Sequence, residues 1–143
     1  MATIIDDGYL ELTDGTDTLK LACEEIIVDM VLKPKMKHYE GGTNLGYDLG
    51  VNYFIFKVSG VILDSYTKFK NCISYLKSWQ ASAPFSLKIK RDTTNYTEWD
   101  GSNTTFKVLV KGGLKALEAL SITQFEDVWY IGNITFEEAG SRS

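Results

Sequence analysis

Cysteine and proline are scarce in this chain, and histidine is nearly absent. The 143 residues include 2 Cys, 2 Pro and 1 His. Because Cys23 and Cys72 stand 49 positions apart without a CxxC pair, a disulfide framework is excluded, and both are expected to be reduced, buried thiols. His38 has no second histidine or neighbouring cysteine with which to begin a zinc site of the ordinary type. The sequence therefore predicts no bound metal.

Long apolar runs are also missing. No stretch approaches the roughly 18 apolar residues of a membrane-spanning helix. The first residues, MATIIDDGYL, lack the basic region and apolar core of a signal peptide. With 44% hydrophobic and 13% aromatic residues, the composition is that of a globular protein. We expect a single domain over residues 1–143, synthesised in the cytoplasm, with no membrane anchor.

Catalytic motifs are not found either. No Ser, His and Asp grouping stands out, and Gly41-Gly42 does not follow the strand-to-helix pattern of a phosphate-binding loop. The acidic residues between 92 and 100 lack the spacing of a calcium loop. We therefore expect neither enzymatic activity nor a cofactor.

Charge is present in blocks of opposite sign. Residues 1–32 carry a net −7, residues 33–91 a net +7 and residues 92–143 a net −4. Such blocks can steer identical subunits into register head to tail. The alternative is that they face one another within one fold or are simply solvated. The net acidic balance and the lack of an Arg-rich stripe disfavour nucleic-acid binding.

The first third of the chain has the pattern of strands. Residues 9–12 and 18–22 are expected to form a hairpin around Asp14-Gly15, followed by a strand at 24–32. Residues 52–63 are expected to form a strand with a bulge or close backbone approach at Gly60. Its buried face is predicted to contain Phe54, Phe56, Val58 and Ile62.

One amphipathic helix is expected over residues 64–80, capped by Asp64. Its apolar face is predicted to contain Tyr66, Phe69, Cys72, Ile73, Leu76 and Trp79. Further strands are expected at residues 85–90, 96–99, 104–110, 121–125 and 128–136. Asp100-Gly101 is a hairpin-turn signal. Residues 114–120 have an ambiguous period and could form a helix by propensity, but the strands that follow favour an antiparallel pair. The predicted fold is mainly β (α+β), an antiparallel sandwich or barrel of about eight strands flanked by one helix.

A long arm is expected at residues 33–50, KPKMKHYEGGTNLGYDLG, which have four glycines and no clear period. Loops beyond about 12 to 15 residues tend to be functional, disordered or extended arms. The arm opens with three lysines and also contains apolar residues that a solvated loop does not need.

Aromatic residues suggest a second function. Trp79, Trp99, Trp129 and the 8 tyrosines offer material for a sugar-binding platform, although core packing is the simpler interpretation. A carbohydrate-binding β-sandwich module or adhesin is therefore the alternative function.

Two segments resemble tail proteins of tailed viruses. The strand FKVSGVILD leads into the helix SYTKFKNCISYLKSW. The ending GGLKALEALSITQFEDVWYIGNITFEEA is similar to the closing strand pair of tail-tube and distal-tail baseplate proteins, W-x-I-x-x-I-x-F-x-E. The matching positions are Trp129, Ile131, Ile134, Phe136 and Glu138. One residue is out of step, which would require a bulge near Gly132. The resemblance covers about residues 52–138.

This resemblance implies a structural protein of the virion tail or of a related injection machine. The most direct expectation is the tail-tube subunit, which forms stacked hexameric rings around the genome channel, with a baseplate ring or tail terminator as related forms. The expected partners are further copies of the chain and other tail or baseplate proteins. The arm would then reach a neighbouring subunit, with Lys33, Met36, Tyr39, Leu45 and Tyr47 at the interface.

A tube that conducts DNA should not bind it, and carboxylates in the lumen would repel the phosphate backbone. The candidates for the channel lining are Asp14, Asp17, Glu126 and Asp127. Ordinary outer-surface turns are the alternative interpretation for each of them.

Overall fold

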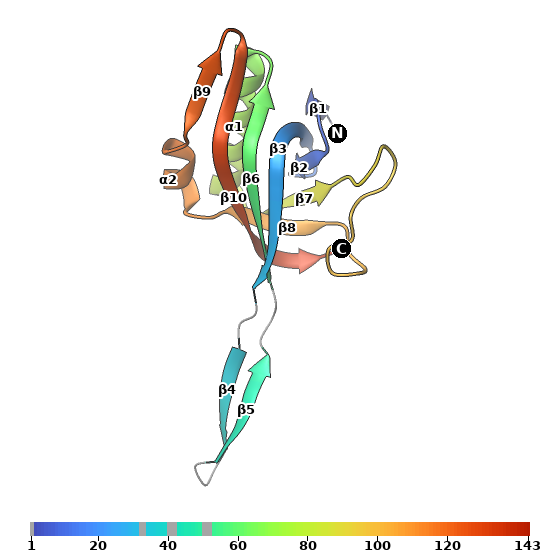
Figure 1. Ribbon diagram of the computed structural model, residues 1–143, viewed down its shortest axis with the longest axis vertical. Helices are drawn as coiled ribbons and strands as arrows, with labels where there is room; N and C mark the ends of the chain where they lie inside the picture. The colour runs from blue at the N-terminus through green and yellow to red at the C-terminus, as the bar shows by residue number, and fades with distance from the viewer. Residues whose placement is uncertain (1, 32–33, 40–42, 50–52) are drawn as a thin grey trace.

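The computed structural model describes residues 2–31, 34–39, 43–49 and 53–143, with side chains for 2–31 and 53–143. Among these residues, six strands close into an antiparallel barrel in the order β3, β2, β7, β8, β10, β6 (Figure 1). Their bounds are β2 Leu10–Thr13, β3 Asp17–Val31, β6 Tyr53–Leu63, β7 Phe85–Ile89, β8 Phe106–Val110 and β10 Val128–Arg142. The pairing of β3 with β6, from Ala22 opposite Ile62 to Val31 opposite Tyr53, closes the ring.

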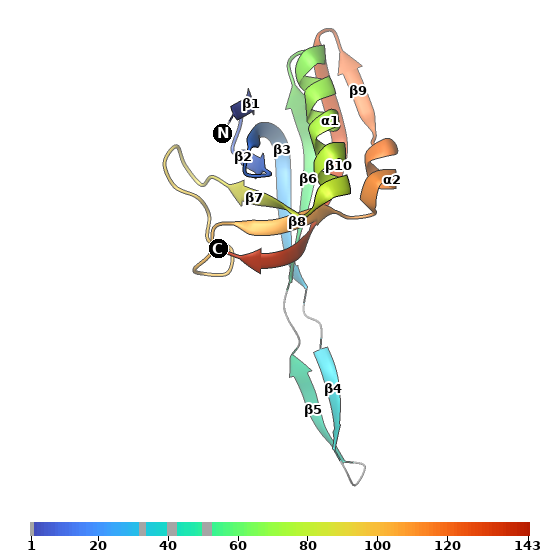
Figure 2. The ribbon, with the colours of Figure 1, turned by 180° about the vertical axis from the view of Figure 1, so that it is seen from behind.

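Further strands and two helices surround the barrel in the described part of the chain. β1 (Ala2–Asp6) pairs in parallel with β3, and β9 (Ile122–Phe125) pairs antiparallel with β10. β4 (Pro34–Tyr39) and β5 (Thr43–Leu49) pair with each other as a separate two-stranded sheet. α1 (Tyr66–Ser82) covers one side of the barrel, and α2 (Gly113–Glu118) lies beside α1 (Figure 2). The mainly β barrel confirms the predicted fold class.

Apolar side chains fill the barrel. Phe56, Phe85, Phe106 and Phe136 are each exposed by 1% or less. The rings of Phe54 and Phe106 meet edge to face with their centroids 5.3 Å apart, a favourable arrangement for aromatic pairs. Each fully buried side chain of this size contributes about 1.5–3 kcal/mol through apolar burial alone. The barrel core is therefore the main source of stability.

The inward-facing phase of β6 changes at Gly60. The buried residues of this strand are Phe54, Ile55, Phe56, Val58, Val61 and Leu63. Gly60 has φ +67°, a left-handed backbone conformation that residues with a Cβ adopt only at a cost in energy. At this position the alternation of buried and exposed side chains along β6 shifts by one residue. The prediction that Ile62 shares the buried face of Phe54 is therefore wrong, because Ile62 lies beyond this switch and is only half-buried.

β10 makes the same switch directly opposite Gly60. Ile131 is buried before Gly132, and the next buried residues are Ile134 and Phe136. The register with β6 does not shift, since Ile131 faces Val61 and Asn133 faces Ser59. The residue out of step near Gly132 is therefore accommodated by a bend that both strands share. The bulge predicted there is not formed in this pairing.

The N-cap of α1 is Ser65 rather than the predicted Asp64. The Ser65 Oγ accepts a hydrogen bond from the backbone N–H of Lys68 at 3.2 Å, which satisfies one of the free donors of the first turn. Asp64 instead bonds the Lys68 Nζ at 3.0 Å. The helix buries Cys72, Leu76 and Trp79. Tyr66, predicted on the buried face, is 59% exposed.

Other predicted elements also need correction. The strands expected at 18–22 and 24–32 are one continuous strand, β3. Residues 96–99 do not form a strand, because Tyr96 makes only an isolated bridge with Lys90 within the long connection between β7 and β8. The ambiguous segment 114–120 contains most of α2, so the described residues have two helices where one was predicted.

Candidate functional site

The predicted arm contains the two-stranded sheet of β4 and β5, here called the ribbon. Met36 is the register partner of Tyr47, Tyr39 ends β4, and Leu45 lies on β5. Lys33 lies outside the described residues. Figure 1 shows the ribbon extending beyond the ends of β3 and β6, away from the barrel. The absence of a clear period in this segment led to the expectation of an irregular arm, so its strands were missed.

The outer edges of the ribbon have no strand partner among the described residues. A two-stranded hairpin is at best marginally stable by itself in water. Open strand edges also offer unpaired N–H and C=O groups to another chain. A partner strand would therefore stabilise the ribbon.

Asp14 and Asp17 lie at the turn between β2 and β3. The Asp14 carboxylate accepts hydrogen bonds from the backbone N–H groups of Thr16 at 2.9 Å and Asp17 at 2.8 Å. These bonds, above all the one from Asp17, hold the pKa of Asp14 below its ordinary value. Asp14 therefore stabilises the turn in addition to placing a negative charge on the surface.

Glu126 and Asp127 form the exposed turn between β9 and β10. Glu126 has φ +54°, and its carbonyl oxygen accepts a hydrogen bond from the Gln124 Nε2 at 2.9 Å. This bond from a β9 side chain stabilises the turn between β9 and β10. Both carboxylates remain at the surface.

The two acidic turns lie toward opposite ends of α1. Asp14 interacts with Trp79, near the end of the helix. Trp129, two residues after Asp127, stacks on Phe69 with a centroid distance of 4.5 Å. Ten residues separate Phe69 from Trp79, a rise of roughly 15 Å. The four carboxylates therefore do not lie together within one subunit. A channel wall that contained all of them would have to run along α1.

A groove that the sequence did not predict lies between α1, α2 and β9. It has a volume of about 590 Å³, and its apolar lining comes from Tyr66, Phe69, Ile73, Leu117 and Ile122. Lys70 and Lys77 also line it. The sequence feature that corresponds to this groove is the apolar arc of the helix, because the arc is wider than the part of it that the barrel covers. The groove is a concave surface suited to apolar contact with another chain.

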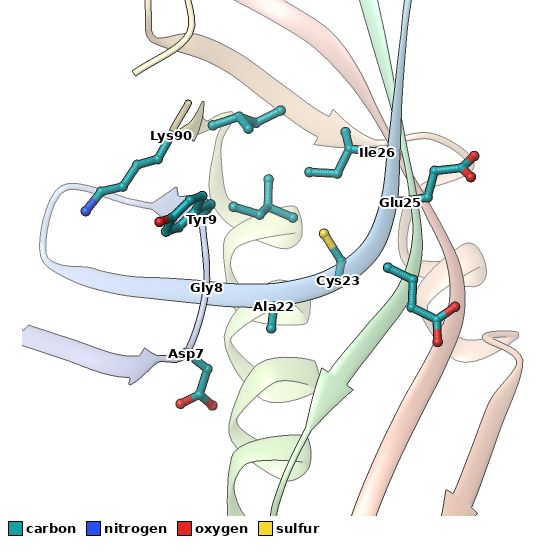
Figure 3. Close-up of a pocket in the computed structure, with 11 residues that line it drawn as sticks. Asp7, Gly8, Tyr9, Ala22, Cys23, Glu25, Ile26 and Lys90 are labelled. Carbon is teal, nitrogen blue, oxygen red and sulfur yellow. The ribbon is translucent and has the colours of Figure 1, made fainter. Parts of the chain in front are cut away.

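A second hollow, of about 470 Å³, opens where β3 bends (Figure 3). Cys23 and Ile26 point into it, while Asp7 points away. Burial raises the pKa of the Cys23 thiol, which favours its neutral form. Asp7 accepts hydrogen bonds from the Lys68 Nζ at 3.0 and 2.9 Å. The wall of the hollow is therefore apolar at Cys23 and Ile26, and the Asp7 carboxylate does not point into it.

The tryptophans do not form a surface platform. Trp79 is 4% exposed and packs against Phe85, with the ring centroids 5.5 Å apart. Trp129 is half-buried against Phe69, and Trp99 is half-buried against the core. These positions are those of packing residues, and a sugar-binding surface would have to rely on other side chains.

Within the described residues, neither helix is long and apolar enough to cross a bilayer. The same residues hold no grouping of three or more His, Cys, Asp or Glu side chains suited to a metal ion. No protein-family model matches the chain, and no curated protein is significantly similar to it.

Proposed function

We propose that the chain is a structural subunit of a viral tail, most directly the tail-tube subunit, whose copies form stacked hexameric rings around the genome channel. The observation that carries the proposal is a closed barrel from which a ribbon with open edges projects (Figure 1). The barrel strands already have neighbours on both sides, so folding of the barrel does not require the ribbon. A projecting ribbon of this kind is suited to contact with another subunit.

The composition of the ribbon supports an interface role. Its sequence includes Met36, Tyr39, Leu45 and Tyr47, and three lysines open the arm from Lys33 onward. Aromatic and methionine side chains are enriched where protein interfaces are most buried. In the proposed assembly these residues anchor the ribbon on a neighbouring subunit, and the basic and acidic blocks align one ring with the next.

The proposed channel is lined by the acidic turns, with Asp14 and Asp17 in one and Glu126 and Asp127 in the other. Like charge keeps the phosphate backbone of DNA from being held in transit. DNA therefore passes without specific binding. Replacing the four carboxylates by Asn or Gln, with assembly checked first, should increase DNA retention by the tubes. Unaltered retention would remove these residues from the channel wall.

In this proposal the subunit performs no catalysis and uses no cofactor. Its partners are further copies of itself and other tail or baseplate proteins, and it is made in the host cytoplasm before joining the virion. A baseplate ring or a tail terminator would use the same barrel and ribbon in a single ring instead of a stack.

The mass and shape of the purified chain test the proposal. Light scattering after size exclusion should give about six times 16.1 kDa or larger polymers, and electron micrographs should show rings or tubes. A particle of 16.1 kDa at every concentration up to about 1 mM would contradict the proposal.

A further inference from the structure

Two strands outside the barrel have open edges on opposite flanks of α1. In the described chain, β1 pairs only with β3, and β9 pairs only with β10. On one flank, the Lys68 Nζ bonds Asp7, which directly follows β1. On the other flank, Phe69 stacks on Trp129 of β10, the partner of β9. Figures 1 and 2, which view the molecule from opposite sides, both show β1 and β9 on opposite sides of it.

Among the residues that the structure describes, nothing gives the β9 edge the usual protection against pairing with another chain. All four of its residues are exposed, with Ile122 at 44% and Phe125 at 70%. Natural edge strands are commonly shielded by charges, prolines or a covering segment. The sequence of β9, ITQF, has neither a charge nor a proline. An apolar edge of this kind, next to an apolar groove, marks an interaction surface.

The backbone groups that point outward can be assigned from the alternation of the ladder. The Gly132 N–H donates to the Ser121 carbonyl at 2.6 Å, and the β9–β10 register is regular. Every second residue from Ser121 onward therefore bonds to β10. Gln124 falls between these residues, so its N–H points to the open edge. On β1, the Ala2 N–H donates to the Thr16 carbonyl at 2.8 Å, so the N–H of Thr3 points outward.

We propose that β9 of one copy pairs with β1 of the next copy, and that this contact and the ribbon together join the subunits within a ring, neither being sufficient alone. The inference rests on the proposed function, because it names the lateral surfaces of that assembly. The strands match in length, with 4 residues in β9 and 5 in β1. Because the two surfaces differ and lie on opposite flanks, the contact is heterologous, and its repetition closes a ring when the rotation permits.

Charge complementarity supports this pairing. Lys70 and Lys77 line the groove beside β9, and their spacing along α1 is roughly 10 Å. Asp6 ends β1, and Asp17 is the register partner of Ala2 at its other end. Because the β1–β3 register shifts between Thr3 and Ile5, Asp6 and Asp17 point to opposite faces of the sheet, so Asp6 alone is assigned to this contact and Asp17 remains a channel residue. No ion pair occupies the side chains of Lys70, Lys77 and Asp6 within the described residues.

Proline variants of the full chain test the strand pairing. Gln124→Pro removes the outward N–H of β9 and leaves the alternating bonds to β10 in place. Gln124→Ala is the matched control, because it removes the side-chain bond to Glu126 and keeps the N–H. Thr3→Pro and Thr3→Ala form the same pair on β1. We expect both proline variants to remain folded by circular dichroism and to sediment as monomers, while both alanine variants assemble like the wild type.

Mixing the two proline variants gives the sharpest result. Each retains one intact surface, so a head-to-tail contact predicts that their mixture forms 1:1 dimers and no rings in native mass spectrometry. Pairing of β9 with a second β9 would leave Thr3→Pro fully assembled and would overturn the proposal. Unchanged rings in both variants would also overturn it, while the proposed ring-forming function would stand. A monomeric wild type would instead contradict the proposed function itself.

A charge exchange provides an independent readout. The Lys70→Glu, Lys77→Glu double variant should weaken subunit association by about tenfold, and adding Asp6→Lys should restore part of it. Equal weakening in the triple variant would mean that Asp6 does not meet the two lysines across the contact, and would overturn the assignment of the groove to β1.

Discussion

The barrel and the ribbon are built from the same kind of secondary structure but differ in how their strands are paired. Each barrel strand has a neighbour on both sides, whereas β4 and β5 have only each other among the described residues. The barrel also buries a continuous apolar core. The difference separates two tasks within one chain. The closed barrel supplies the stability of the fold, and in the proposed assembly the strands with open edges supply the surfaces for contact between subunits.

The largest expected effect on the fold comes from the barrel core. Phe56 is fully buried, and its ring lies 5.8 Å from that of Phe106. Phe56→Ala should lower the free energy of unfolding by about 3–5 kcal/mol, through lost burial and the cavity that remains. Denaturant titration measures the change. Met30→Ala on β3, where the side chain is 58% exposed, is the control and should change it by less than about 0.5 kcal/mol.

A smaller effect is expected from the ion pair at the end of the barrel. The Glu138 carboxylate accepts hydrogen bonds from the Arg142 Nε at 2.6 Å and from the Phe54 N–H at 3.0 Å. Glu138→Ala leaves both donors without this acceptor, so the free energy of unfolding should fall by about 1–3 kcal/mol. Glu137→Ala on the same strand is the comparison. Equal losses in the two variants would argue against a specific role for Glu138.

The shared bend of β6 and β10 can be tested at Gly60. Gly60 has φ +67°, and an added Cβ would lie 2.8 Å from the Glu24 side chain. Gly60→Ala should therefore cost about 1–2 kcal/mol of stability from backbone strain, with crowding by Glu24 in addition. Gly15→Ala, at φ +96° in open space, carries the backbone cost alone. The account of the bend predicts a larger loss for Gly60, measured by thermal unfolding, and a smaller one would contradict it.

The smallest expected effect is on how the melting temperature depends on pH in acid. Hydrogen bonds from Asn103, together with Ser102 and Arg142, hold the pKa of Asp100 well below its ordinary value. A depressed pKa contributes stability that is present above the ordinary carboxyl value, near pH 4, and is lost as the pH falls further. Asp100→Asn should flatten the decline of melting temperature below pH 4. The exposed Asp127→Asn is the control and should follow the wild type.

The strands that face the core could be predicted because burial leaves a period of two in the sequence. Phe85, Leu87 and Ile89 illustrate this, since all three are buried as their alternation with Ser86 and Lys88 predicted. Phase errors arose where one glycine changes the alternation, as at Gly60. Periodicity has no means of detecting such a switch, because it depends on one left-handed backbone angle.

The candidate surfaces were less predictable, because they depend on segments that meet only after folding. The groove needs α2 and β9 to reach the same flank of α1, and residues 114–120 allowed a helix by propensity while the neighbouring strands favoured an antiparallel pair there. The ribbon was expected as an arm but not as paired strands, since its four glycines weaken the strand pattern. Pairing between β4 and β5 supplies the order that local propensity does not predict.

Replacing residues 33–50 by a short Gly-Ser linker tests the division between barrel and ribbon most directly. Val31 and Tyr53 are register partners across β3 and β6, so a short linker can join the two strands without opening the barrel. A full-length control carries Ser at Met36, Tyr39, Leu45 and Tyr47. Sedimentation velocity should show a monomer with native circular dichroism for the linker variant, and weakened assembly for the control. Rings of unchanged size in the linker variant would contradict the claim that the ribbon assembles the subunits.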